Sequence, residues 1–173
     1  MSDHMTILQT EHLTLREVTL EDDAFVFELL NEPAYLRSIG DKGVRSPEDA
    51  RKYISIGPLA SYAQHGFGLW RVALKDSDTP IGMCGLLKRE GMEHTDLGYA
   101  VLARFHGQGY ARESAATVLV HARNVLKLGT LQAVTTPENP ASIGLLEKLG
   151  FRFDRMITLP GYDGERRLFI VNL

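Results

Sequence analysis

Two kinds of hydrophobic pattern follow one another along this chain. Alternating or short apolar runs are typical of strands, and apolar residues three and four positions apart are typical of helices. The first pattern predicts strands over residues 6–16, 67–75, 80–88, 94–102, 131–136, 151–159 and 166–173. The second predicts helices over residues 21–31, 47–64, 110–127 and 140–149. The expected order is therefore β-α-α-β-β-β-α-β-α-β-β.

Residues typical of helix ends support several of these boundaries. Thr19, with an acid three residues later, forms a shortened capping box, and Ser46 before a proline is a typical helix start. Gly66 is placed to end the second helix, and the Gly-Pro pair at 57–58 is expected to kink or divide that helix. Residues 31–45, which hold one proline and two glycines, are expected to form a loop.

The connections between the elements indicate how the strands pair. Short loops within 67–102 predict an antiparallel meander. The strand at 94–102 reaches 131–136 through a long helix, which requires parallel pairing if the two are neighbours. We therefore expect an α/β (α+β) fold, with a mixed, mostly antiparallel sheet of about seven strands and helices on both faces. No linker divides the chain, so we expect one domain over 6–173 after an extension at 1–5.

The composition narrows the classes of function. With 44% hydrophobic and 24% charged residues, the 173-residue chain is typical of a globular protein that buries a substantial core. Its net charge of −3 argues against a nucleic-acid partner. No apolar run approaches the ~20 residues of a membrane span, and the N-terminus lacks a secretory pattern. We therefore expect no membrane partner and a cytoplasmic location.

Thiol and metal chemistry are also disfavoured. Cys84 is the only cysteine, so no internal disulfide forms and cysteines supply no zinc cage. Its segment, I-G-M-C-G-L-L, is typical of a strand, which favours a small buried residue over a nucleophile. The six histidines lack the spacing of metal ligands, and we expect no metal.

The most informative stretch is D-L-G-Y-A-V-L-A-R-F-H-G-Q-G-Y-A-R-E-S, at residues 96–114. A strand pattern runs into two glycines and then into a helix pattern. Such a loop turns several backbone N–H groups toward one small space at a helix start, which suits a pyrophosphate. A tight turn without a ligand is the alternative. The dinucleotide fingerprint is incomplete and the Walker lysine is missing, which disfavours a nucleotide-binding protein of another fold.

A second motif, N-P-A-S-I-G-L-L-E-K-L-G-F, stands at residues 139–151. Together with the first motif and the element order, it resembles the GNAT superfamily of acyl-CoA N-acyltransferases, and more narrowly the branch of the ribosomal-protein N-terminal acetyltransferases. The resemblance covers almost the whole chain. The family signature is Arg or Gln, two residues, Gly, one residue, then Gly or Ala. Here it reads H-G-Q-G-Y-A, so His106 stands where Arg or Gln is usual.

The resemblance implies acetyl-CoA as co-substrate and two central strands that part to admit its pantetheine arm. It assigns Tyr99, Ala100 and Val101 to the strand that bonds this arm, and residues 107–112 to the amides that hold the pyrophosphate. Asn139 is a typical N-cap and is also implied to contact the arm. The implied cofactor-binding residues are Tyr99, Ala100, Val101, His106, Gly107, Gln108, Gly109, Tyr110, Ala111, Arg112 and Asn139.

Acetyl transfer to an amine requires a base and is helped by an acid at the leaving thiolate. Asp96 is the best base candidate, at a position where the resembling branch often has Glu, and the shorter Asp favours relay through a water. Glu93 and His94 are alternatives, and Asp96 as a solvated strand-start acid is another. Leu146 stands where many members have Tyr. The chain resembles instead the branch with Asn-x-x-Ser, and this resemblance implies Ser142 as the acid. Local backbone bonding is the alternative role for that serine.

The acceptor site is less defined. The resemblance places it between loops at 31–46 and 160–166, whose acids could favour a cationic amine: Glu32, Asp41, Asp163 and Glu165. We expect acetyl transfer to a primary amine, either a protein N-terminus or a small molecule, by a monomer or homodimer. A non-catalytic acyl-CoA-binding module is the competing hypothesis.

Overall fold

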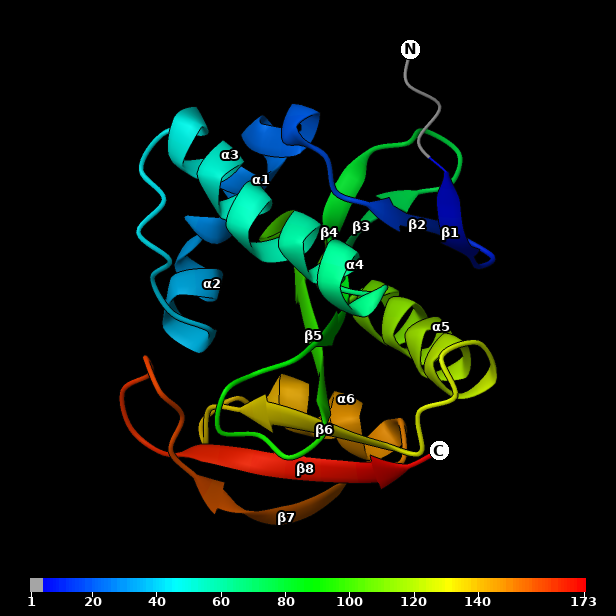
Figure 1. Cartoon of the computed structure of the whole chain (residues 1–173), viewed down its shortest axis with the longest axis vertical. Helices are drawn as coiled ribbons and strands as arrows, with labels where there is room; N and C mark the ends of the chain where they lie inside the picture. The colour runs from blue at the N-terminus through cyan, green and yellow to red at the C-terminus, as the bar shows by residue number, and fades with distance from the viewer. Residues whose placement is uncertain (1–4) are drawn as a thin grey trace.

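An eight-stranded sheet organises the computed structural model, which describes residues 5–173 (Figure 1). The strand order is β1-β2-β3-β4-β5-β6-β8-β7. The strands are β1 (Thr6–Gln9), β2 (Leu13–Glu17), β3 (Leu69–Leu74), β4 (Pro80–Leu87), β5 (Thr95–Val101), β6 (Thr130–Thr135), β7 (Arg152–Ile157) and β8 (Arg166–Asn172). Neighbours pair antiparallel except β5 and β6, which are parallel. The expected mixed, mostly antiparallel sheet is confirmed, with the parallel β5–β6 pair in its interior.

Six α-helices surround the sheet. They are α1 (Asp23–Leu30), α2 (Pro33–Ser38), α3 (Pro47–Ile54), α4 (Ala60–His65), α5 (Tyr110–Asn124) and α6 (Pro140–Lys148). Short turns of other helix types lie at η1 (Leu20–Asp22), η2 (Ser55–Leu59) and η3 (Ala103–Phe105). None of the helices in the described part of the chain has the length and apolar content that a membrane crossing requires.

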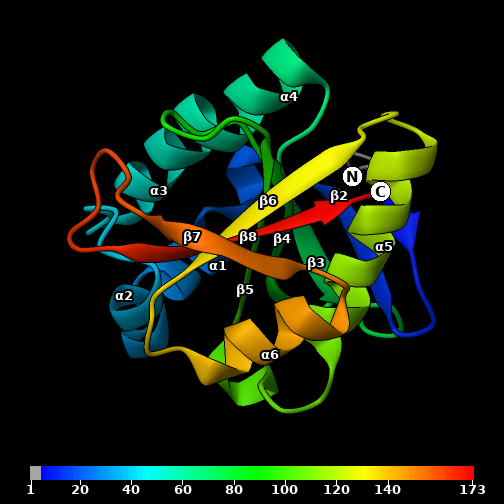
Figure 2. The ribbon, with the colours of Figure 1, turned by 90° about the horizontal axis from the view of Figure 1, so that it is seen from below.

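Helices cover both faces of the sheet, as expected. Cys84 of β4 packs in a core cluster with Val118 of α5, to which α6 also contributes. Met83, the preceding residue, belongs to a second cluster with Leu29 of α1 and Ile54 of α3. Adjacent strand residues point to opposite faces, so the two clusters lie on opposite sides of the sheet, with α3 on one side and α5 and α6 on the other (Figure 2).

Two predictions about the N-terminal half are wrong in detail. Residues 6–16 form two strands rather than one, so the sheet has eight strands instead of about seven. The turn between them is held by Glu113 of α5, whose carboxylate accepts from the Thr10 hydroxyl at 2.6 Å and the His12 N–H at 2.9 Å. Residues 31–45 contain helix α2, because Pro33 is the first residue of a helix and Tyr35 is buried in the second cluster.

The predicted helix ends are confirmed. Ser46 accepts a hydrogen bond from Asp49 N–H at 3.1 Å, and Pro58 lies in the π-helical turn η2 that separates α3 from α4. Gly66 ends α4 with a φ of +77°, which glycine adopts at little cost. The extension expected at residues 1–5 lies outside the described residues except for Met5.

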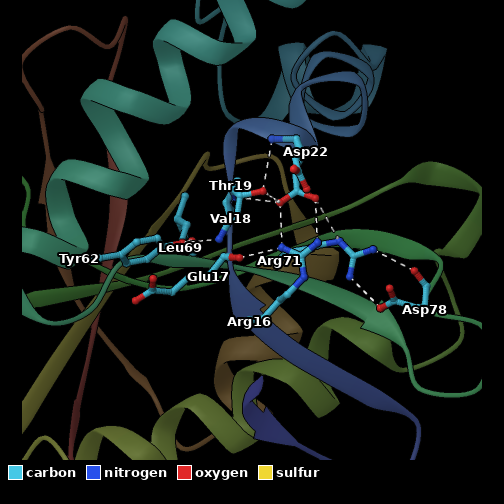
Figure 3. A network of polar contacts seen from close by, with 10 residues as sticks. Arg16, Glu17, Val18, Thr19, Asp22, Tyr62, Leu69, Arg71 and Asp78 are labelled. Carbon is cyan, nitrogen blue, oxygen red and sulfur yellow. Dashed lines mark hydrogen bonds and ion pairs between the residues drawn. The ribbon is translucent and has the colours of Figure 1, made fainter. Parts of the chain in front are cut away.

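The capping box at Thr19 belongs to a larger polar network that joins β2, η1 and β3 (Figure 3). Asp22 accepts two hydrogen bonds from Arg16, at 2.8 and 2.9 Å, and one from Thr19 N–H at 2.8 Å. Arg71 Nε lies 3.6 Å from the same carboxylate, and its guanidinium donates to Asp78 at 3.0 Å. The network therefore surrounds the Asp22 carboxylate with donors.

Cys84 is fully buried in the first cluster, as the sequence predicted. Burial raises the pKa of its thiol to about 12, although a hydrogen bond with Ser114 opposes this. The thiol is therefore protonated at neutral pH and does not act as a nucleophile.

Candidate active site

The central feature of the site is the point where β5 and β6 part. Their parallel pairing is limited to Thr95 with Leu131 and Asp96 with Gln132, whereas β5 stays paired with β4 as far as Val101. Beyond Asp96, one side of β5 therefore has no strand neighbour. An unpaired strand edge presents N–H and C=O groups that a ligand can bond.

The hydrogen-bond register shows which groups of β5 face this gap. Leu102 N–H donates to Ile81 C=O on the β4 side at 2.7 Å. Because successive residues of an antiparallel strand direct their backbone groups to alternate sides, Val101 and Tyr99 direct theirs away from β4. The expected role of β5 as a bonding strand thus concerns the peptide groups of these two residues.

The gap opens into a cavity of about 960 Å³. It is lined by twelve of the thirteen residues that the sequence analysis proposed as base, acid or cofactor contacts: Asp96, Tyr99, Ala100, Val101, His106, Gly107, Gly109, Tyr110, Ala111, Arg112, Asn139 and Ser142. Gln108 is exposed and does not line the cavity. Thr135 of β6 also lines it, and its buried hydroxyl oxygen has no hydrogen-bond partner among the described residues. A buried polar atom without a partner is unusual in a folded protein.

The glycine loop forms the end of the cavity at the start of α5. Gly107 and Gly109 have φ values of +76° and +83°, a conformation that favours glycine. The first helical bond runs from Glu113 N–H to Gly109 C=O at 3.0 Å. The N–H groups of residues 110–112 therefore have no carbonyl within α5 to bond. They combine with the helix dipole into a site suited to an anion.

His106 contacts the strand that precedes the loop. Its ring Nε2 lies 2.6 Å from Val101 C=O. A carbonyl only accepts, so Nε2 carries the hydrogen in this contact. The unusual residue of the signature therefore bonds one of the two peptide groups that β5 turns toward the gap. Nothing in the sequence pattern predicted this contact.

A hydroxyl pair lies across the gap between β5 and α6. The hydroxyls of Tyr99 and Ser142 are hydrogen-bonded to each other, and Asn139 caps α6 by accepting from Ser142 N–H at 3.2 Å. Burial raises the pKa of Tyr99 to about 12, while the bond to Ser142 opposes the shift. Tyr99 is therefore protonated at neutral pH. The sequence singled out both residues but gave no sign that they meet.

Asp96 is almost completely buried, with 1% of its surface exposed, where the two central strands part. Its Oδ2 accepts a hydrogen bond from Arg89 Nε at 2.5 Å, while Oδ1 has no partner among the described residues. Burial raises the pKa of Asp96 to about 6 despite the opposing charge of Arg89. Asp96 thus lines the cavity with one buried carboxylate oxygen that has no partner among the described residues and with a raised pKa.

Three residues that the sequence did not single out complete this end of the cavity. Arg89 Nη1 donates to the Tyr162 hydroxyl at 2.5 Å, and Lys42 Nζ donates to the same oxygen at 2.9 Å. Lys42 and Tyr162 belong to the two loops that the resemblance assigned to the acceptor, so these loops meet here. They come from distant parts of the chain, and no local motif links them.

The four acids expected to attract a cationic amine do not line the cavity. The Glu32 carboxylate accepts from Ala103 N–H at 2.8 Å, and Asp41 is paired with Arg45. Asp163 and Glu165 are exposed on the last hairpin loop. That expectation is therefore not met. Among residues 5–173, no group of three or more His, Cys, Asp or Glu side chains is arranged to hold a metal.

The parted strands and the glycine loop suited to an anion are the arrangement that the resemblance to acyl-CoA N-acyltransferases implied. Consistent with this class, residues 12–152 match the family model described as acetyltransferase (GNAT) domain. The chain therefore belongs to the GNAT family and is an acetyltransferase.

Relatives and solved structures agree with this membership. The chain is 28% identical over 156 residues to the uncharacterized N-acetyltransferase p20 of Bacillus licheniformis, with 88% of this chain and 86% of p20 covered. A GNAT-family acetyltransferase from Bacillus anthracis has the same fold, with a TM-score of 0.80, 22% identity and coverage of 97% and 98%. RimL, a ribosomal L7/L12 α-N-protein acetyltransferase solved with coenzyme A, also has this fold. Its TM-score is 0.82 and its sequence identity is 17%, with 98% of each chain covered.

Proposed function

We propose that this protein transfers the acetyl group of acetyl-CoA to a primary amine, on a protein N-terminus or a small molecule, by direct attack in a ternary complex. The observation that carries the proposal is the gap beside β5, which joins an anion site at one end to Asp96 at the other. One sheet spans Thr6 to Asn172, so we assign the activity to a single domain over residues 6–173.

Acetyl-CoA fits the cavity by its chemistry. The pantetheine arm carries amides, which match the peptide groups of Tyr99 and Val101 as a further strand would. The pyrophosphate matches the amides of residues 107–112, and Gln108, whose side chain lies outside, would contribute through its backbone. Arg112 in the first turn of α5 adds positive charge at this end, and Lys148 of α6 also lines the cavity. RimL, which shares the fold, binds coenzyme A.

Asp96 is the proposed base. The amine nitrogen attacks the thioester carbonyl, and it must lose a proton as the new C–N bond forms. Oδ1 of Asp96 has no partner and Oδ2 is held by Arg89, so the carboxylate is oriented and still able to accept. We expect the proton to pass through a water, because the aspartate side chain is short.

Ser142 is the proposed acid. Breaking the C–S bond leaves a thiolate, which takes the hydroxyl proton of Ser142. The Tyr99 hydroxyl is hydrogen-bonded to Ser142 and is protonated at neutral pH, so it can return a proton to the serine oxygen. The proton of Ser142 thus goes to the thiolate first, and the proton of Tyr99 then goes to Ser142.

Calorimetry and thiol release test the proposal. Acetyl-CoA should bind to the purified protein, and a panel of amines should yield at least one acceptor that releases free thiol. Gly109→Trp should abolish binding, because the side chain would fill the open space above the loop. Gly66→Trp imposes similar backbone strain at a helix end outside the cavity and should leave binding intact, with circular dichroism confirming both folds.

The outcomes separate the possible failures. No heat from acetyl-CoA with the wild-type protein would contradict the proposal outright. Binding without thiol release from any amine would favour a non-catalytic acyl-CoA-binding module. Unchanged affinity in Gly109→Trp would show that the loop is not the pyrophosphate site.

A further inference from the structure

The cavity lining is strongly basic although the chain has a net charge of −3. Six lysine or arginine side chains line it, against one carboxylate, Asp96. Arg112 belongs to the first turn of α5, at the end assigned to the phosphates. Lys42 and Arg89 lie at the end that holds Asp96, where both contact Tyr162. The other three that line the cavity are Arg37, Lys88 and Lys148. Only Arg89 is paired with a described carboxylate. The acceptor end therefore has uncompensated positive charge.

Hydrogen-bond donors converge at one point of this end. The Tyr162 oxygen accepts from both Lys42 and Arg89, so its own O–H is left to donate. Arg89 uses Nε and Nη1 in these contacts, and Nη2 donates to no described residue. Lys42 has two further N–H groups. All three side chains thus offer donors, and a ligand that only accepts would satisfy them.

The surroundings of Tyr162 reinforce the positive potential. Lys42, Arg166 and Arg89 lie 4.9, 5.2 and 5.4 Å from the centre of its ring. Burial raises the pKa of the Tyr162 hydroxyl, but the contacts with Lys42 and Arg89 lower it by more. A negatively charged group is therefore favoured beside this hydroxyl.

Resting on the proposed function, we propose that the acceptor amine carries a carboxylate, which binds Lys42, Arg89 and Tyr162 while the amine faces Asp96. Arg89 connects the two positions, because its Nε bonds Asp96 and its Nη1 bonds Tyr162. The rigid guanidinium fixes their separation. The carboxylate therefore lies close to the reacting amine, as in a free amino acid or in a peptide whose second residue is acidic.

Matched acceptors test this proposal by thiol release at saturating acetyl-CoA. Alanine is compared with alaninamide, and Ala-Asp-Ala-amide with Ala-Asn-Ala-amide. In each pair only the carboxylate changes. The acidic member of at least one pair should have a kcat/KM higher by about tenfold, and the pair that shows the preference identifies the source as an amino acid or a peptide.

Variants locate the effect. Lys42→Glu should remove the preference by raising KM for the acidic acceptor. Lys52→Glu makes the same charge change on α3, at an exposed residue outside the cavity, and should keep the preference. Rates within twofold in both pairs, a preference for the neutral members, or turnover of other amines alone would overturn the inference and leave the proposed function standing.

If no amine is acetylated, the proposed function is contradicted. A binding measurement then tests the carboxylate site separately. Calorimetry then compares N-acetyl-Ala-Asp-Ala-amide with its Asn counterpart on the protein saturated with coenzyme A. Tighter binding of the acidic peptide, lost in Lys42→Glu, would support the carboxylate site. Equal binding of the two peptides, or none, would overturn it.

Discussion

Asp22 and Asp96 are both buried aspartates paired with arginine, yet their pKa values shift in opposite directions. Burial raises the pKa of each carboxyl. At Asp22 the hydrogen bonds from Arg16 and Thr19 and the charge of Arg71 outweigh burial, and the pKa falls below its ordinary value. At Asp96 a single arginine opposes burial, and the pKa rises to about 6. Asp96 is the more deeply buried of the two, 1% exposed against 8%, and it accepts from fewer donors, so burial and donors both separate them.

The difference in donors corresponds to a difference in position. Asp22 lies outside the cavity, where Arg16 and Arg71 tie β2 and β3 to the start of α1. Asp96 lines the cavity and keeps one oxygen without a partner. A fully bonded carboxylate stabilises the fold, and an incompletely bonded one retains the capacity to take up a proton.

The largest expected effect is on the rate. Asp96→Asn should lower kcat/KM by about 10²–10⁴, the usual contribution of a general base, while acetyl-CoA affinity stays within a few-fold. Below pH about 6 the wild-type rate should fall with decreasing pH by an additional factor of about ten per pH unit, compared with the variant. The reason is that the Asp96 carboxyl, with a pKa of about 6, must be ionised to act as a base. Steady-state kinetics from pH 5 to 9 measure both, and identical profiles would rule out Asp96 as the base.

The next effect is on stability. Asp22→Asn should lower the free energy of unfolding by about 3–5 kcal/mol, because it leaves the largely buried Arg16 without its carboxylate partner and Arg71 with Asp78 alone. Asp78→Asn is the matched control: its side chain is 75% exposed, although it also pairs with Arg71, and it should cost less than about 1 kcal/mol. Urea denaturation at pH 7 compares them. Equal losses for the two variants would mean that the network does not depend on burial.

The pH dependence of stability should have opposite signs at the two sites. The lowered pKa of Asp22 contributes stability that is present above the unfolded value of 3.8 and lost as the pH falls through the folded value. Because the pKa of Asp96 is raised, the native state binds more protons than the unfolded state between pH 3.8 and about 6. The contribution of Asp96 to the free energy of unfolding therefore falls as the pH rises through that window, by no more than about 3 kcal/mol.

Denaturation at a series of pH values checks these signs. Asp96→Asn should remove the decline between pH 4 and 6, and Asp22→Asn should flatten the loss below pH 4. A wild-type stability that rises steadily through both windows, unchanged in Asp96→Asn, would contradict the raised pKa.

Local chemistry explains why much of the fold was predictable. The periods of the hydrophobic pattern gave the strands and helices, and Thr19, Ser46 and Gly66 marked helix ends through contacts within a few residues. The division of residues 6–16 was missed because the turn depends on Glu113, which reaches it from α5. Helix α2 was missed because a proline is equally typical of a loop and of a first helical turn.

The site was predictable only where one segment carries it. The glycine loop and the start of α6 are continuous motifs, and their residues line one cavity. Lys42, Arg89 and Tyr162 meet through the packing of three separate segments, and each has an ordinary sequence context. The acids within 31–46 and 160–166 were assigned to the acceptor site for the same reason. A position in a loop beside the cavity does not show whether a side chain faces that cavity.

Direct titration of the carboxyl groups by carbon-detected NMR tests the central claim that the pKa of Asp96 is raised toward neutral pH while that of Asp22 is lowered. Spectra of Asp22→Asn and Asp96→Asn assign the two resonances. We predict that Asp96 titrates at about 6 and Asp22 below 3.8. An Asp96 carboxyl that remains ionised down to pH 4 would contradict the account.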